Sequence, residues 1–151
     1  MAPDTRSLLI LSLIGGLPFC FAGCSGDSAS QDDVAATESA YESGLKCFEQ
    51  SDFSGAETQL VTAITSGTLQ PDLTEAALRT LARARIAQGK LAEAEETLKQ
   101  LQAGAMEQDQ FLLVTAELEL KKNNRDAAKR AVQQARSVNA KLVIPASLKG
   151  L

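Results

Sequence analysis

The chain has 151 residues, which is enough for one small domain with a leader and a linker. Alanine, leucine, glutamate, glutamine, lysine and arginine dominate the composition. Because most of these side chains lose little rotamer freedom in a helix, an all-α fold is favoured. The chain has no histidine, which excludes Ser–His nucleophilic catalysis and proton transfer by imidazole. The formal net charge of −4 argues against a nucleic-acid partner.

The N-terminus begins with an apolar run from Leu8 to Ala22, preceded by Arg6. A membrane-spanning helix needs about 20 apolar residues, and this run is shorter and contains Gly15, Gly16 and Pro18. A short apolar stretch that ends in small residues is typical of a secretory signal peptide. We therefore expect residues 1–23 to be a signal peptide.

The segment Phe21-Ala22-Gly23-Cys24 at the end of this run resembles the lipobox of bacterial lipoproteins, although that family usually has leucine in place of Phe21. The resemblance implies cleavage before Cys24, acylation of Cys24 with chains such as palmitate, and a membrane anchor at the cell envelope. Ser25 is not the aspartate that retains many lipoproteins at the inner membrane, so we expect the periplasmic face of the outer membrane. The alternative is ordinary cleavage after Ala22, which releases a soluble exported protein.

Residues 24–36 are polar and acidic, and we expect a flexible linker there. The linker belongs to a strongly acidic part of the chain, since ten acids and one base lie between Asp27 and Glu75, whereas eight bases and one acid follow from Lys121 onwards. Such a gradient either steers a partner or a membrane surface or reflects solvated helix faces. Of the three cysteines, Cys47 is the one left for the folded domain, and we expect it in the core.

The remainder of the chain contains three stretches in which two helix-period runs are separated by a polar break. A small residue stands just inside each second run, at Ala56, Ala94 and Ala128, and these alanines are 38 and 34 residues apart. This pattern is similar to the tetratricopeptide repeat, a helical hairpin of about 34 residues. The resemblance implies a right-handed superhelix of three antiparallel helix pairs (a TPR-like α-solenoid) over residues 37–70, 75–108 and 109–140, with residues 141–151 as a cap. The small residues expected to pack between helices are Gly44, Ala56, Ala82, Ala94, Ala116 and Ala128.

Local signals mark several of the expected helix ends. Ser51 or Asp52 is suited to cap a helix entered at Phe53, and Pro71 is suited to a first helical turn. The expected connection over residues 66–73 is four residues longer than the regular spacing, which predicts a first hairpin splayed from the second. Arg85 occupies a position where the family usually has an aromatic residue, and we expect its stem to cover apolar surface.

In tetratricopeptide arrays the first helices of the hairpins line a concave groove that binds a protein segment. Arg79 and Arg83 are one turn apart on such a helix, which predicts that they can hold a carboxylate together. The alternative for several groove positions is packing between repeats. The aligned positions place these residues in the groove: Tyr41, Leu45, Phe48, Arg79, Arg83, Ile86, Leu113, Glu117, Leu120 and Lys121.

The sequence contains no recognisable metal-ligand cluster, phosphate loop or nucleophile paired with a base. The acids Glu93, Glu95 and Glu96 are typical of a solvated helix face. We therefore expect a protein that is not an enzyme and has no cofactor or metal. The expected function is that of a lipid-anchored envelope scaffold or adaptor with a protein or peptide partner, within an assembly or secretion complex. The alternatives are an accessory subunit of an envelope enzyme and a soluble exported protein with an unrecognised activity.

Overall fold

The computed structural model describes residues 30–151, so the predicted signal peptide, the lipidation site at Cys24 and the first part of the predicted linker lie outside the described residues. Residues 30–151 form six α-helices and one short 3-10 helix and contain no strand, which confirms the predicted all-α fold. The helices are α1 (Gln31–Glu49), α2 (Phe53–Thr65), α3 (Pro71–Ala87), α4 (Leu91–Gln102), α5 (Gln108–Lys121), α6 (Arg125–Val138) and the 3-10 helix η1 (Ala146–Leu148).

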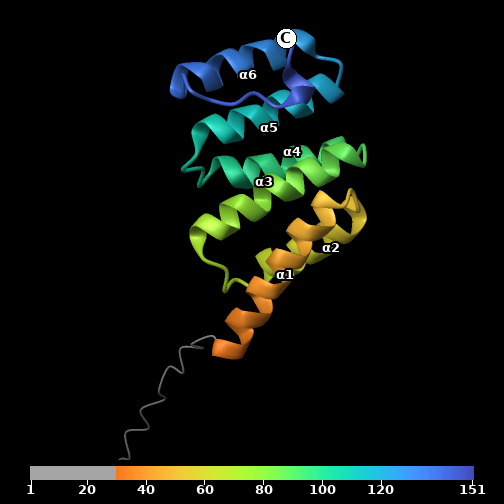
Figure 1. The fold of residues 1–151 in the computed structure, drawn as a ribbon, viewed down its shortest axis with the longest axis vertical. Helices are drawn as coiled ribbons and strands as arrows, with labels where there is room; N and C mark the ends of the chain where they lie inside the picture. The colour runs from red at the N-terminus through yellow and green to blue at the C-terminus, as the bar shows by residue number, and fades with distance from the viewer. Residues whose placement is uncertain (1–29) are drawn as a thin grey trace, which may run out of the picture.

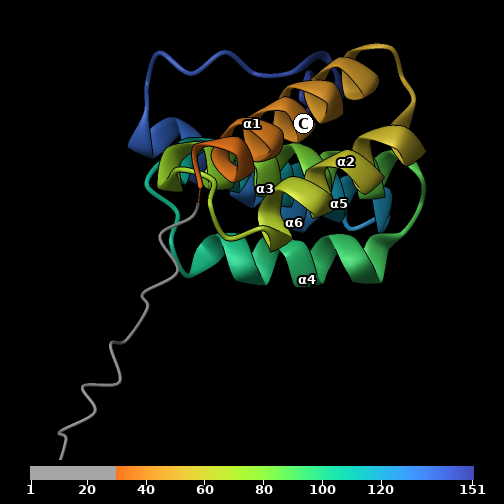
Figure 2. The ribbon, with the colours of Figure 1, turned by 90° about the horizontal axis from the view of Figure 1, so that it is seen from below.

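The helices follow one another along the long axis of the molecule in chain order (Figure 1). Each helix packs against the next one in sequence, and α3 also contacts α1 and α5. Seen along this axis, α1 and the C-terminal tail lie at one edge of the molecule and α4 lies at the opposite edge (Figure 2). The odd-numbered helices α1, α3 and α5 are therefore neighbours, although other helices separate them in the sequence.

Helix α1 begins at Gln31, within the segment that was predicted to be a flexible linker up to residue 36. The reason is a capping box. The Ser30 hydroxyl accepts a hydrogen bond from the Asp33 amide at 3.2 Å, and the Asp33 carboxylate accepts one from the Ser30 amide at 3.2 Å. Each bond satisfies an amide that has no partner inside the helix, so the helix extends six residues further toward the N-terminus than expected. The linker prediction is therefore wrong for residues 31–36.

The turns within the three helix pairs share one backbone geometry. Ser51, Gly89 and Asn123 each stand five residues before the small residue of the second helix, and their φ angles are 63°, 78° and 61°. A left-handed residue commonly ends a helix because it allows the next amides to bond back to the last carbonyls. The repeat seen in the sequence is thus also a repeat of conformation.

A polar contact recurs between successive helix pairs. Gln88 donates a hydrogen bond to Glu57 at 3.0 Å, and the equivalent Lys122 donates one to Glu95 at 2.6 Å. Each glutamate directly follows the small residue of its second helix, at Ala56 and Ala94. Sequence positions that repeat therefore make the same contact from pair to pair.

Arg85 is the centre of a polar network between the first two helix pairs and does not simply cover apolar surface. Its Nε bonds to Glu57 at 2.9 Å, and its Nη1 donates to the hydroxyl of the buried Thr97 at 2.7 Å. Lys90 and Gln88 also donate to Glu57. Burial alone would raise the pKa of the Glu57 carboxyl, but the hydrogen bonds from Lys90, Arg85 and Gln88 together outweigh this and lower the pKa below its usual range.

The small residues expected between helices are all buried, and five of the six are alanines with no exposed area. Gly44 shows why size matters at these positions, because a Cβ added there would lie 2.7 Å from Leu60 Cγ. Close approach of α1 and α2 at this point therefore requires a residue without a side chain. The positions concerned are Gly44, Ala56, Ala82, Ala94, Ala116 and Ala128.

The longer spacing before the second helix pair does not splay the first pair from it. The α2–α3 connection has five residues, the same number as the α4–α5 connection, and most of the extra residues lengthen α3, which begins at Pro71. Leu60 of α2 packs against Ala77 and Leu81 of α3 in one buried cluster. The prediction of a splayed first hairpin is therefore corrected.

The C-terminal tail packs back onto the last helix pair. Leu148 of η1 is 2% exposed and joins a cluster with residues of α5 and α6, and Leu142 and Ile144 pack against the same cluster. Val143 points outward and is 84% exposed. The tail thereby brings Pro145 and Ser147 to the side of α5.

Candidate functional site

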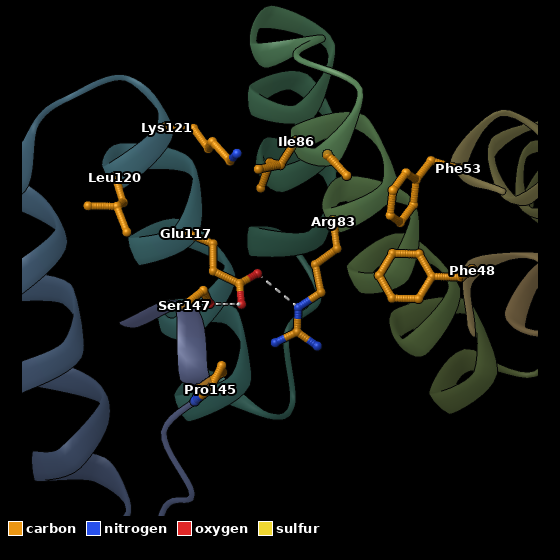
Figure 3. A pocket seen from close by; sticks show the side chains of 10 residues that line it. Phe48, Phe53, Arg83, Ile86, Glu117, Leu120, Lys121, Pro145 and Ser147 are labelled. Atoms are coloured by element: carbon orange, nitrogen blue, oxygen red, sulfur yellow. Dashed lines mark hydrogen bonds and ion pairs between the residues drawn. The ribbon is translucent and has the colours of Figure 1, made fainter. Parts of the chain in front are cut away.

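A pocket of about 590 Å³ opens on the side of the molecule formed by α1, α3 and α5. The α1–α2 turn forms one wall, α3 the floor and α5 with the C-terminal tail the other wall (Figure 3). Most of its lining side chains are apolar, and three are charged. We call this the Arg83 pocket, and it is lined by Phe48, Phe53, Arg83, Ile86, Ala87, Glu117, Leu120, Lys121, Pro145 and Ser147.

Two phenylalanines form the wall contributed by the first helix pair. Phe48 lies in the last turn of α1 and Phe53 is the first residue of α2, so the short turn brings them together. Their ring centroids are 5.6 Å apart with an interplanar angle of 65°, an edge-to-face arrangement. Asp52 fixes the start of α2, as predicted, by accepting a hydrogen bond from the Gly55 amide at 2.9 Å. The cap and the ring contact together orient this wall.

An ion pair crosses the pocket between α3 and α5. Arg83 Nε donates a hydrogen bond to Glu117 Oε2 at 3.1 Å, and the side chains are 28% and 16% exposed. The Ser147 hydroxyl donates to the other oxygen of Glu117 at 3.4 Å. Figure 3 shows the Arg83 guanidinium between the two phenylalanine rings and the tail. Among the described residues, nothing accepts a hydrogen bond from its two terminal nitrogens, and Lys121 has no ion pair.

The structure brings together six of the residues predicted for the groove. Each lies on the first helix of its pair and lines the pocket (Figure 3), although Ile86 also belongs to the buried core and Leu120 also packs against the cluster of α5, α6 and η1. These residues are Phe48, Arg83, Ile86, Glu117, Leu120 and Lys121.

Two other predicted groove residues, Tyr41 and Leu45, are half-buried in α1 and do not line the pocket. Tyr41 packs against the cluster around Leu60 and Leu81, and burial raises the pKa of its hydroxyl. These contacts correspond to the alternative in which some groove positions pack between repeats.

Leu113 is a core residue and not a groove residue. It is 1% exposed and packs in the cluster formed with α6 and η1. Helix α5 contacts α3, α4, α6 and η1, so little of its surface around Leu113 is left for a partner. The prediction of Leu113 as a groove residue is therefore corrected.

Arg79 does not act together with Arg83. It pairs with Glu107 and, at 3.8 Å, with Glu75, and it lines a separate hollow near the α4–α5 connection. The buried Glu75 carboxylate accepts hydrogen bonds from the Met106 amide at 2.9 Å and the Glu107 amide at 3.1 Å. Arg79 thus belongs to a cluster that holds the start of α5, and the expected pair of arginines around one carboxylate is not formed.

The pocket also contains residues that sequence reasoning missed. Phe53 had a usable signal, since it lies five residues from Phe48 across a predicted turn. Pro145 and Ser147 had no sequence signal that would place them in the pocket, because the tail reaches α5 through tertiary contacts that no local pattern encodes. Ala87 follows Ile86 at the end of α3 and was not predicted either.

Two other kinds of site, a metal site and a membrane-spanning helix, are absent from the part of the chain that the structure describes. Within residues 30–151, no group of three or more acidic or cysteine side chains is arranged to hold a metal ion. No helix in the same range combines the length and apolar character needed to cross a membrane. Of the acids in α4, Glu93 and Glu96 are exposed and Glu95 is half-exposed, and the hydrogen bond from Lys122 lowers the pKa of the Glu95 carboxyl.

Comparison with protein-family models, with curated proteins and with solved structures finds no match for this chain. The described fold and the Arg83 pocket therefore define its class: an all-α protein with an open, largely apolar pocket on the side of α1, α3 and α5.

Proposed function

We propose that this protein is a lipid-anchored scaffold or adaptor of the bacterial cell envelope that binds a segment of another protein in the Arg83 pocket. The observation that carries the proposal is the composition of that pocket. Residues from three successive helix pairs and from the tail converge on one opening, with apolar walls around a single ion pair. Ligand sites in proteins are typically concave and mostly apolar, with a few placed polar groups that fix orientation.

The proposed architecture is a TPR-like α-solenoid in which three antiparallel helix pairs form a right-handed superhelix. The repeated left-handed turn residue and the repeated contact from Gln88 and Lys122 to the preceding pair support it. In such an array the concave side is formed by the first helices, and these helices provide most of the pocket lining. A binding role follows more naturally from this arrangement than catalysis does.

The proposed location rests on the N-terminal sequence. Acylation of Cys24 would anchor the chain at the periplasmic face of the outer membrane, because two or three acyl chains hold a protein firmly at a bilayer. Labelled palmitate should be incorporated into the wild-type chain and not into Cys24→Ala. A soluble, unlabelled protein cut after Ala22 would contradict the anchor without bearing on the pocket.

Capture from crosslinked membranes tests the binding role. Wild-type protein should retain a discrete partner, and Phe53→Ser should lose it, because this change removes one of the two aromatic rings that form an apolar wall of the pocket. Val143→Ser is the matched control, since Val143 is an apolar residue that is 84% exposed and does not line the pocket. Equal capture by wild type, Phe53→Ser and the control would contradict a role for the pocket.

A further inference from the structure

We infer that the segment bound in the Arg83 pocket carries a bulky apolar side chain close to a carboxylate. This inference rests on the proposed binding function and names the chemistry of its partner. It follows from two properties of the same pocket, its apolar walls and the open hydrogen-bond donors of Arg83 and Lys121.

The apolar part of the pocket is large enough for a large side chain and part of the segment that carries it. Its volume of about 590 Å³ lies within the range of about 300–1,000 Å³ that is common for ligand sites. Ile86 is 5% exposed and forms the floor, and the two phenylalanine rings stand at one side. Burial of an aromatic or branched aliphatic side chain there removes apolar area from water on both partners. The apolar lining consists of Phe48, Phe53, Ile86, Ala87, Leu120 and Pro145.

The charged residues of the pocket determine which charge on the bound segment is favoured. Arg83 and Lys121 supply two positive charges and Glu117 supplies one negative charge, so the lining has a net charge of +1. Both oxygens of Glu117 already accept hydrogen bonds, one from Arg83 and one from Ser147. Each oxygen of Glu117 thus has a donor, whereas the terminal nitrogens of Arg83 have no acceptor within the described part of the chain. A guanidinium with free N–H groups matches a carboxylate in geometry and charge.

The arrangement therefore favours an acidic segment over a basic one. A basic side chain would meet the positive charges of Lys121 and Arg83. An acidic side chain gains hydrogen bonds without breaking any that the structure contains. Repulsion from Arg83 and Lys121 disfavours a basic segment, so the same two residues attract an acidic segment and reject a basic one.

A peptide library tests the inference directly. The full chain, purified in mild detergent, is incubated with immobilised 12-residue peptides of serine, glycine and alanine. Each peptide carries Leu, Ile, Phe or Ser at one central position and Asp, Lys or Ser at a distance of one to four residues. We expect the peptides that combine an apolar residue with Asp to bind at least tenfold better than those that combine it with Lys or Ser.

Two variants assign the preference to the pocket. Lys121→Glu changes the lining charge from positive to negative and should reduce the preference for Asp over Lys at least fivefold. It should not disturb the fold, since Lys121 is exposed and has no ion pair among residues 30–151. Lys129→Glu makes the same change in net charge on α6, away from the pocket, and should leave the preference unchanged.

Several outcomes would overturn the inference. They are equal binding of Asp and Lys peptides, a preference for Lys, and an Asp preference that both lysine variants reduce equally. A dimer that forms with rising concentration, is broken by Phe53→Asp and leaves the library unbound would assign the pocket to a second copy of the chain. If membrane capture depends on Phe53 but the library shows no charge preference, the inference fails and the proposed binding function stands.

Discussion

Arg83 of α3 and Glu117 of α5 are joined by a hydrogen bond of 3.1 Å across the pocket, although they are 34 residues apart in the sequence. Both belong to first helices of neighbouring pairs, and both side chains are partly withdrawn from water. The bond ties the floor of the pocket to its α5 wall and holds the guanidinium in place. Arg83 therefore links α3 to α5, and it also carries the donors of the proposed recognition of a partner.

A double-mutant cycle measures the contribution of this link to stability. Arg83→Gln and Glu117→Gln should each destabilise the protein, and the double variant should lose less than the sum of the two. The expected coupling is about 1 kcal/mol, since partly buried pairs in contact typically couple by about 0.5–3 kcal/mol. Urea unfolding of the four proteins followed by circular dichroism gives the values. Strict additivity would mean that the pair adds nothing to stability.

Gly44→Ala should weaken the contact between α1 and α2. The added Cβ would lie 2.7 Å from Leu60 Cγ and 3.3 Å from the Leu60 amide nitrogen, so the helices would have to move apart. Overpacking of this kind costs about 1–3 kcal/mol, which should exceed the gain in helix propensity of about 1 kcal/mol. Thermal unfolding measures the change. Gly104→Ala is the control, because a Cβ there meets nothing within 4 Å and no large loss is expected.

The carboxylate of Glu57 should make stability depend on pH. Because hydrogen bonds lower its pKa in the folded state, Glu57 contributes stability at pH values above its unfolded pKa of about 4.3. That contribution is lost as the pH falls through the lower, folded pKa. Wild type should therefore be more stable than Glu57→Gln at pH 6, and the difference should shrink toward pH 3. A difference that stays constant over this range would mean that the network does not act through the ionised carboxylate.

Glu75 should hold the start of α5 in place. Glu75→Ala removes the acceptor of the Met106 and Glu107 amides and leaves Arg79 with one carboxylate partner fewer. Loss of hydrogen bonds to a charged group costs about 1.5–3 kcal/mol. Hydrogen exchange should become faster at these two amides than at the amides of α2, which Glu75 does not contact. Unchanged exchange at Met106 and Glu107 would show that the connection is held by other contacts.

Much of the fold was predictable because the relevant signals are local. The helix-period runs, the small residues at Ala56, Ala94 and Ala128, and the start signals at Asp52 and Pro71 all act within a few residues of where they stand. Helical spacing placed Arg83 and Ile86 on one side of their helix, because residues of one helix face share a direction, and the tetratricopeptide resemblance placed Glu117 on the same side of the array.

The parts of the fold and of the pocket that were not predicted depend on tertiary contacts that sequence periodicity does not encode. Arg79 and Arg83 share a helix face, yet Arg79 pairs with Glu75 of its own helix and with Glu107 of the α4–α5 connection. Leu113 has groove spacing but is covered by α6 and the tail. The tail itself contains no helical pattern, so its placement of Pro145 and Ser147 beside α5 could not be foreseen. Local patterns thus predict which residues face the same way, whereas the final partners of charged side chains depend on tertiary packing.

We propose that the Arg83 pocket is where this protein holds a partner. The most direct measurement is photocrosslinking in intact cells, with a photoreactive phenylalanine at Lys121 in the pocket or at the exposed Gln133 on α6. We expect a discrete adduct from position 121 that disappears when Phe53→Ser is added, and no such adduct from position 133. Adducts of equal yield from both positions, or an adduct from position 121 that survives Phe53→Ser, would contradict it.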